Sequence, residues 1–127
     1  MTKMPTPLVL IAEDEPRLAQ ALAFMLRQEG LEPLVAGDGR AVLRLVEEFR
    51  PALLLLDLDL PELDGLTVCR TLRAHPATAS LPIFILTALG QREHERAALD
   101  AGADAYLRKP FSIPALRDEI RARLGRE

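Results

Sequence analysis

The chain has 127 residues, of which 49% are hydrophobic and 28% charged, and its formal net charge is -3. This length and composition are typical of one globular domain with a single hydrophobic core. The acidic balance argues against direct nucleic-acid binding, and the lack of an apolar run of about 18 residues argues against a membrane span. Because the chain has one cysteine, Cys69, and no secretory signal pattern, we expect a cytoplasmic protein without an internal disulfide.

Short apolar runs alternate with helical patterns along the chain. Strands are predicted over residues 8–12, 32–37, 52–57, 82–88 and 104–109. Helices are predicted over residues 16–30, 39–49, 65–75, 92–101 and 112–125, with Gly30 ending the first and Ser112 capping the last. The alternation and the continuous apolar strands predict an α/β fold, with a doubly wound, five-stranded parallel sheet between two layers of helices.

Polar side chains follow four of the predicted strands. In an open parallel sheet, ligands bind outside the carboxyl ends of the strands, so these residues are the first candidates for a site. They are Glu13 and Asp14 after the first strand, Asp57 and Asp59 after the third, Thr87 at the end of the fourth, and Lys109 at the end of the fifth. If the first and third strands are neighbours, the carboxylates of Glu13, Asp14 and Asp57 converge.

Converging carboxylates repel one another unless a cation lies between them. Mg²⁺, which prefers oxygen ligands and retains water, is the natural partner for such a cluster. Lys109 adds a positive charge, and Thr87 adds a hydroxyl that can donate to a phosphoryl oxygen. Carboxylate, Mg²⁺, lysine and hydroxyl are together the groups needed to place a phosphoryl group on Asp57.

Four segments in this order carry a resemblance to a known family: "IAEDE", "LLLLDLDLPELDG", "ILTA" and "GADAYLRKPF". With them the chain resembles the receiver domain of two-component response regulators. The resemblance implies a flavodoxin-like fold with strand order 2-1-3-4-5. We expect one receiver domain over residues 1–127, with its core at about 8–124 and no effector domain, which is the form either of a stand-alone response regulator or of a receiver cut from a longer protein.

The resemblance also implies a role for each candidate residue. Asp57 would be the phosphoacceptor, Lys109 would pair with the phosphoryl group, and Thr87 and Tyr106 would move together as a switch. The peptide bond between Lys109 and Pro110 would be cis. A Mg²⁺ ion would be held, directly or through water, by Glu13, Asp14, Asp57 and the backbone carbonyl of Asp59.

Two of these positions depart from the family's usual pattern. Glu13 stands where an aspartate is more usual, and its longer side chain is expected to reach the metal through water. Asp59 is an acid at a variable position beside the phosphoacceptor. We expect its charge to affect the lifetime of the acyl phosphate.

The partners follow from the same resemblance. The phosphoryl donor would be a phosphohistidine on a sensor histidine kinase or a histidine phosphotransfer protein. The output would be contact with a downstream effector protein, through the face built by helix 92–101, the fifth strand and the last helix. The domain would accept and lose a phosphoryl group without being a conventional turnover enzyme.

A phosphorylation-linked dimer is a further expectation drawn from receivers that precede winged-helix domains. Those receivers dimerise through the last two helices and the fifth strand. Ala105 and Glu119 stand where they usually have an acid and an arginine, so this chain departs from the usual contact.

Two alternatives share parts of this chemistry. The run "LLLLDLD" also matches the Asp-x-Asp opening of haloacid-dehalogenase-type phosphatases, but there it follows the first strand, and here it follows the third. The other alternative is a pseudo-receiver that binds partners without being phosphorylated, against which the presence of Asp57, Thr87 and Lys109 argues.

Overall fold

The structure is a computed structural model that describes residues 6–88 and 92–125. Its strands are β1 (Leu8–Ala12), β2 (Glu32–Ala36), β3 (Leu53–Leu56), β4 (Ile83–Thr87) and β5 (Ala105–Arg108). Its helices are α1 (Pro16–Gln28), α2 (Gly39–Phe49), α3 (Gly65–Ala74), α4 (Arg92–Asp100) and α5 (Ile113–Arg123). The predicted alternation of strand and helix is confirmed, and the ends of the elements differ from the predicted ones by a few residues.

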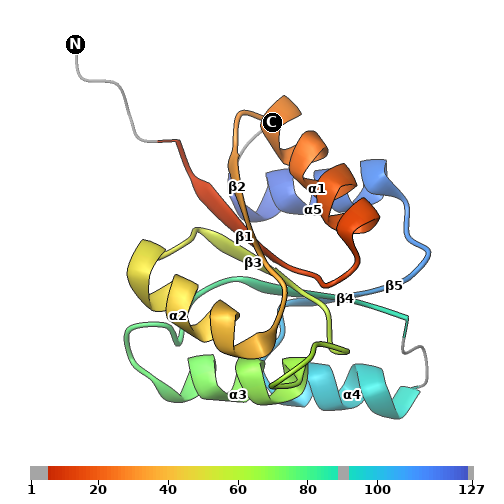
Figure 1. Cartoon of the computed structure of the whole chain (residues 1–127). Coiled ribbons are helices and arrows are strands. Elements are labelled where there is room, and N and C mark those ends of the chain that lie inside the picture. The colour runs from red at the N-terminus through yellow and green to blue at the C-terminus, as the bar shows by residue number, and fades with distance from the viewer. Residues whose placement is uncertain (1–5, 89–91, 126–127) are drawn as a thin grey trace.

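The sheet has the order β2-β1-β3-β4-β5, and every pair of neighbouring strands is parallel. This confirms the doubly wound, flavodoxin-like fold. Helices α1 and α5 cover one face of the sheet, and α2, α3 and α4 cover the other (Figure 1). The strand order reverses between β1 and β3, which is where ligands bind in folds of this kind.

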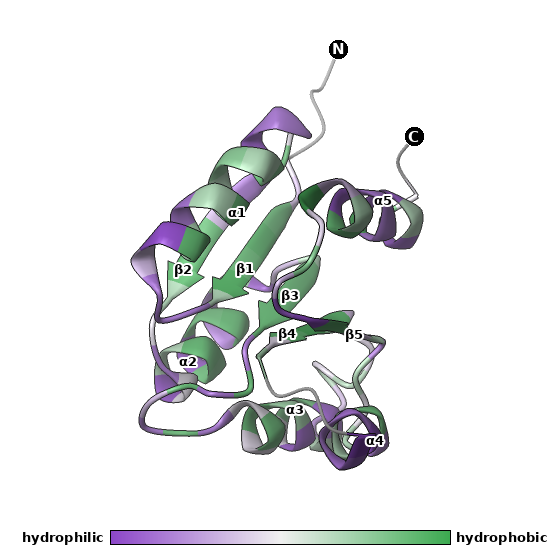
Figure 2. Cartoon of the chain, turned by 90° about the vertical axis from the view of Figure 1, so that its right-hand side faces the viewer, coloured by the Kyte–Doolittle hydropathy of each residue, from purple (hydrophilic) through white to green (hydrophobic). Residues whose placement is uncertain are grey.

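The core consists of one apolar layer on each face of the sheet, because alternate side chains of a strand point to opposite faces. Leu10 and Leu54 pack in the layer under α2, α3 and α4, while Val9 and Leu53 pack in the layer under α1 and α5. All four side chains are inaccessible to solvent. Figure 2 shows the apolar strands between helices whose outer faces are polar.

The helix ends follow local chemistry. The side chains of Asp38, Asp64 and Ser112 accept hydrogen bonds from backbone amides in the first turns of α2, α3 and α5, so the predicted cap of the last helix is confirmed.

In the described part of the chain, no helix is long and apolar enough to cross a membrane. Phe49 lies in the last turn of α2 and is 47% exposed.

Candidate functional site

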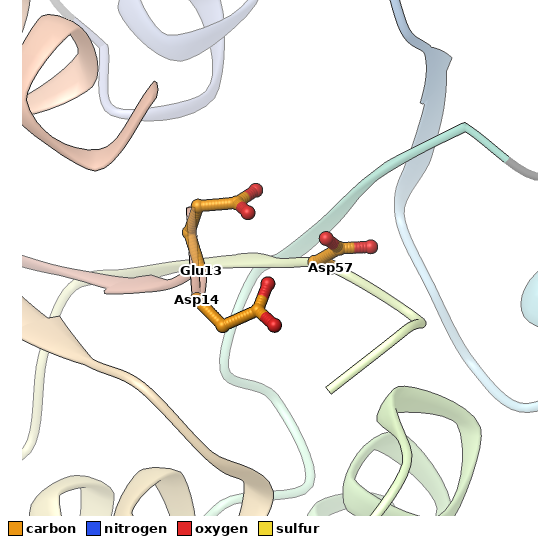
Figure 3. Close-up of side chains that lie close together, drawn as sticks. All are labelled: Glu13, Asp14 and Asp57. Carbon is orange, nitrogen blue, oxygen red and sulfur yellow. The ribbon is translucent and has the colours of Figure 1, made fainter. Parts of the chain in front are cut away.

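The ends of β1 and β3 bring three acidic residues together. The backbone N–H of Asp57 donates to the carbonyl of Ala12 at 3.0 Å, which extends the pairing of the two strands beyond Leu56. Carboxylate oxygens of Glu13, Asp14 and Asp57 lie within 4.8 Å of one another. Figure 3 shows Glu13 and Asp14 side by side at the end of β1, with Asp57 beside them. The predicted convergence is therefore present.

Lys109, the residue after β5, contacts two members of this cluster. Its ammonium nitrogen lies 2.8 Å from Oε1 of Glu13 and 3.0 Å from Oδ2 of Asp57. The backbone N–H of Lys109 donates to the carbonyl of Thr87 at 2.7 Å. This hydrogen bond continues the pairing of β5 with β4 by one residue and so fixes the position of the lysine backbone. One ammonium group thus bridges two carboxylates that come from different strands.

The carboxylates at the centre of the site are buried. Glu13 is 4% exposed and Asp57 is 5% exposed, whereas Asp14 is exposed at the rim. Burial raises the pKa of Glu13, and this effect outweighs the hydrogen bonds from Lys109 and from the backbone of Glu15. Burial lowers the pKa of Lys109, but the hydrogen bonds to Glu13 and Asp57 and the negative charges of both carboxylates together outweigh this effect and hold the pKa above its ordinary value. Lys109 therefore carries a positive charge at neutral pH.

The loop after β3 holds the Asp57 side chain in place. Its Oδ1 accepts a hydrogen bond from the backbone N–H of Asp59 at 3.1 Å. Gly65, at the start of α3, lies against the same segment, since a Cβ at this position would be 2.5 Å from the carbonyl oxygen of Asp57. The Asp59 side chain is exposed, and its carboxylate is not among those that converge.

The residues predicted to switch lie on β4 and β5. Thr87 is fully buried at the end of β4, at the same edge of the sheet as Asp57. Tyr106 pairs with Ile85 in the sheet and packs against the apolar layer on the α2, α3 and α4 face. The peptide bond between Lys109 and Pro110 is cis, as predicted.

The donor set of the cluster fits the predicted Mg²⁺ ion. Carboxylate oxygens from neighbouring strands, one exposed and two buried, are the hard ligands that Mg²⁺ prefers, and the exposed one leaves room for retained water.

Sequence reasoning missed the direct contact between Glu13 and Lys109. The one signal for it in the sequence is the longer side chain of Glu13, which the resemblance relates only to the metal.

Comparisons with known proteins agree with this geometry. The sequence pattern of the response regulator receiver domain matches residues 9–121. The chain is 44% identical over 118 residues to the DNA-binding response regulator MtrA of Mycolicibacterium smegmatis, which covers 93% of this chain and 50% of that protein. It is 39% identical over 120 residues to the DNA-binding dual master transcriptional regulator RpaA of Synechocystis, which covers 94% of this chain and 50% of that protein. The chain thus spans about half the length of the curated relatives it matches.

Solved structures give the same result. The receiver domain of the Francisella response regulator 1452 superimposes with a TM-score of 0.88 at 32% identity, covering 94% of this chain and 98% of that one. The receiver domain of the sensor histidine kinase PA1611 from Pseudomonas aeruginosa, solved with a magnesium ion coordinated in the active site cleft, superimposes with a TM-score of 0.87 at 31% identity, covering 95% of this chain and 99% of that one.

These matches leave the haloacid-dehalogenase alternative without support, because the chain follows another family over nearly its whole length. The sequence pattern, the strand order and the acidic cluster beside a lysine all lead to one assignment. The chain belongs to the receiver-domain family of two-component response regulators.

Proposed function

We propose that this domain is the phosphoacceptor of a two-component or phosphorelay system, and that Asp57 receives the phosphoryl group. The observation that carries this proposal is the contact of the Lys109 ammonium with the Asp57 carboxylate, inside a cluster of converging acids. A buried carboxylate beside a fixed cation, at the reversal point of the sheet, is suited to in-line attack on a phosphorus atom.

In the proposed reaction, a carboxylate oxygen of Asp57 attacks the phosphorus of a phosphohistidine on a partner kinase or phosphotransfer protein. A P–O bond forms as the P–N bond breaks, and the histidine nitrogen leaves with the electron pair of that bond. Glu13, Asp14, Asp57 and the carbonyl of Asp59 are the groups that would hold Mg²⁺. When bound, this ion supplies positive charge that offsets the charge on the phosphoryl oxygens.

Lys109 is the fixed cation of this reaction. Its ammonium group already touches Asp57, so it can pair with a phosphoryl oxygen after transfer with little movement. Water then attacks the acyl phosphate, which restores the Asp57 carboxylate and releases phosphate. The domain therefore passes through a timed, modified state and is not a conventional turnover enzyme.

The output of the proposed switch runs through α4, β5 and α5. Thr87 and Tyr106 lie on the adjacent strands β4 and β5, and β5 is itself part of this face, which supports their role as the switch. We propose that the modified face binds an effector protein or a second copy of the domain. The DNA binding named for the relatives is not assigned to this chain, whose net charge is -3.

The first test is intact-mass measurement after incubation with acetyl phosphate and Mg²⁺. We expect the native protein to gain the mass of one phosphoryl group and the Asp57→Asn variant to gain none, because an amide is too weak a nucleophile to form the acyl phosphate. No gain in the native protein, with Mg²⁺ binding shown separately, would instead identify a pseudo-receiver. Continuous release of phosphate at the rates of an enzyme would contradict the proposed role.

A further inference from the structure

A groove lies between α2 and α3, at the opposite end of the sheet from Asp57. It consists of two adjoining cavities with volumes of about 410 Å³ and about 370 Å³, which is within the size range of small-molecule sites. The residues that line both cavities are Val46, Arg50, Ala77 and Thr78. The second cavity also lies against Ala52 and Pro82, which directly precede β3 and β4. In Figure 1, the segment that joins α3 to β4 passes beside the end of α2.

The two cavities differ in polarity and charge. The aliphatic walls of the first cavity are formed by Leu43, Val46 and Leu72. Glu47 and His75 line the first cavity as well, beside Arg50. Among the described residues that line the second cavity, Arg50 is the only charged one, and Ser80 adds a hydroxyl. The groove therefore offers an apolar surface at one end and a single positive charge at the other.

Arg50 stands at a position that the fold alone does not explain. It ends α2 in the left-handed region, with φ 48° and ψ 64°, where glycine is favoured because a Cβ crowds the backbone. Pro51 follows it, and a residue before proline prefers extended backbone. Within the described part of the chain, the Arg50 side chain forms no hydrogen bond or ion pair. An unpaired cation at a strained position beside a cavity is the arrangement expected of a ligand-binding residue.

The loop that forms the other wall of the groove is held in place by its own hydrogen bonds. The hydroxyl of Thr78 donates to the carbonyl of Leu72 at 2.5 Å, and its backbone N–H donates to the carbonyl of His75 at 3.1 Å. The carbonyl of Thr78 accepts from the backbone N–H of Leu81 at 3.1 Å and from Nη1 of Arg73 at 3.4 Å. Because this wall is already ordered, a ligand would lose little affinity to the cost of forming the site.

We propose that this groove binds a small amphipathic carboxylate, with its hydrocarbon body in the first cavity and its carboxylate paired with Arg50 at the second. A guanidinium group presents two parallel N–H donors that match a carboxylate, and burial of the hydrocarbon supplies the rest of the affinity. Placing the carboxylate at the second cavity also keeps it away from Glu47, which lines only the first. The inference does not rest on the proposed function, because no residue of the groove belongs to the acidic cluster.

The test uses octanoate as the probe, with 1-octanol and octylammonium as probes of the same chain length and different charge. Each is titrated into ¹⁵N-labelled protein, and the chemical shifts of the backbone amides are followed. We expect octanoate to cause saturable shifts at residues 43–52 and 71–82, and to bind about tenfold more tightly than 1-octanol, because it adds a charge-assisted hydrogen bond. Shifts that do not saturate, or that centre on the acidic cluster, would overturn the proposal. Octylammonium binding as tightly as octanoate would also overturn it, since the charge of the ligand would then be wrong.

Three variants at exposed positions of the groove locate the ligand. Arg50→Gln should lower the affinity for octanoate about tenfold and leave that for 1-octanol unchanged, because only the charged interaction is lost. Ala77→Phe should abolish the binding of both probes, since this position lines both cavities and the ring fills them. Glu47→Gln is the matched control and should not weaken octanoate binding. Native affinity for octanoate in Arg50→Gln or in Ala77→Phe would show that the groove is not the site.

Discussion

At the scale of single residues, the loop after β3 ends in a cap that depends on one carboxylate. Asp64 accepts hydrogen bonds of 3.0 Å each from the backbone N–H and from the hydroxyl of Thr67. These bonds satisfy an amide at the start of α3 that has no partner within the helix. They also lower the pKa of Asp64 below its ordinary value, with the backbone bond as the largest cause.

The cap gives a prediction about stability and pH. Asp64→Ala should lower the free energy of unfolding by about 1 kcal/mol at neutral pH. Because the folded pKa is the lower one, this contribution is present above the ordinary pKa of about 3.9 and is lost as pH falls through the folded value. Urea denaturation at neutral and acidic pH measures both effects. Glu48→Ala, at an exposed position of α2, is the control, and an equal loss in both variants would contradict the role of the cap.

At the scale of elements, the start of α3 sets the position of the loop that carries Asp57, the proposed phosphoacceptor. Gly65 lets the helix approach the backbone of Asp57 and Leu58, because a Cβ there would be 2.5 Å and 2.6 Å from their nearest atoms. Both obstructing atoms belong to the main chain, so no side-chain rotation can make room. The same glycine therefore serves the packing of α3 and the geometry of Asp57.

Gly65→Ala should destabilise the domain by about 2 kcal/mol, within the range for an overpacked site, and should slow phosphorylation by displacing Asp57. Gly37→Ala is the matched control, since nothing lies within 4 Å of a Cβ at that position. Chemical denaturation and the rate of phosphoryl uptake measure the two effects. If Gly65→Ala matches Gly37→Ala in stability and in the rate of phosphoryl uptake, the loop after β3 can move to make room for a Cβ, and the prediction is wrong.

At the amino-terminal ends of the strands, opposite the end that carries Asp57, an arginine connects α3, the start of β4 and the turn before β5. Arg73 of α3 donates from Nε to the carbonyl of Gly102 at 2.9 Å and from Nη2 to Asp104 at 3.0 Å. The same oxygen of Asp104 accepts from the backbone N–H of Ile83 at 2.8 Å, at the start of β4. Gly102 leaves space for the arginine, since a Cβ there would lie 2.7 Å from its side chain. The turn that leads into β5 is thus tied to α3 and to β4.

Arg73→Ala should cost about 2 kcal/mol of stability, because it removes hydrogen bonds to a charged and a neutral acceptor and uncovers Asp104. Arg70 also lies on α3 but is exposed, so Arg70→Ala should change the free energy of unfolding by less than about 0.5 kcal/mol. Thermal and urea unfolding of both variants test the difference. The rate of backbone amide exchange at residues 102–105 should also rise in the Arg73→Ala variant and not in the Arg70→Ala variant. An unchanged rate in the Arg73→Ala variant would show that Arg73 does not hold this turn in place.

At the scale of the whole molecule, the proposed Mg²⁺ site should couple metal binding to folding, since the acidic cluster unites residues that follow two different strands. Mg²⁺ at about 100 times its dissociation constant should stabilise the native state by about 2.7 kcal/mol. Asp14→Asn should remove most of this gain while leaving the metal-free protein folded, because Asp14 is exposed. Urea denaturation with and without Mg²⁺, at ionic strength matched with Na⁺, measures the coupling. An equal gain in both proteins would place the ion elsewhere.

The order of the elements and the identity of the site residues could be read from local patterns. The runs Val9–Leu10 and Leu53–Leu56 are apolar because both faces of their strands are covered, and a buried strand has that signature in any context. The ends of the elements depend on contacts that a local pattern does not contain. Strand β3 ends at Leu56 rather than at Asp57, since the aspartate turns from strand pairing to the site.

The sequence alone determined that this chain is a parallel α/β domain with acids, a hydroxyl and a lysine at its strand ends, because these features depend on near neighbours in the chain. Only the tertiary structure decided which of them touch. Glu13 and Lys109 are 96 positions apart, and Lys109 and Asp57 are 52 apart. Their contacts depend on the order of the strands and on ångström-scale reach, and no local pattern of residues contains either quantity.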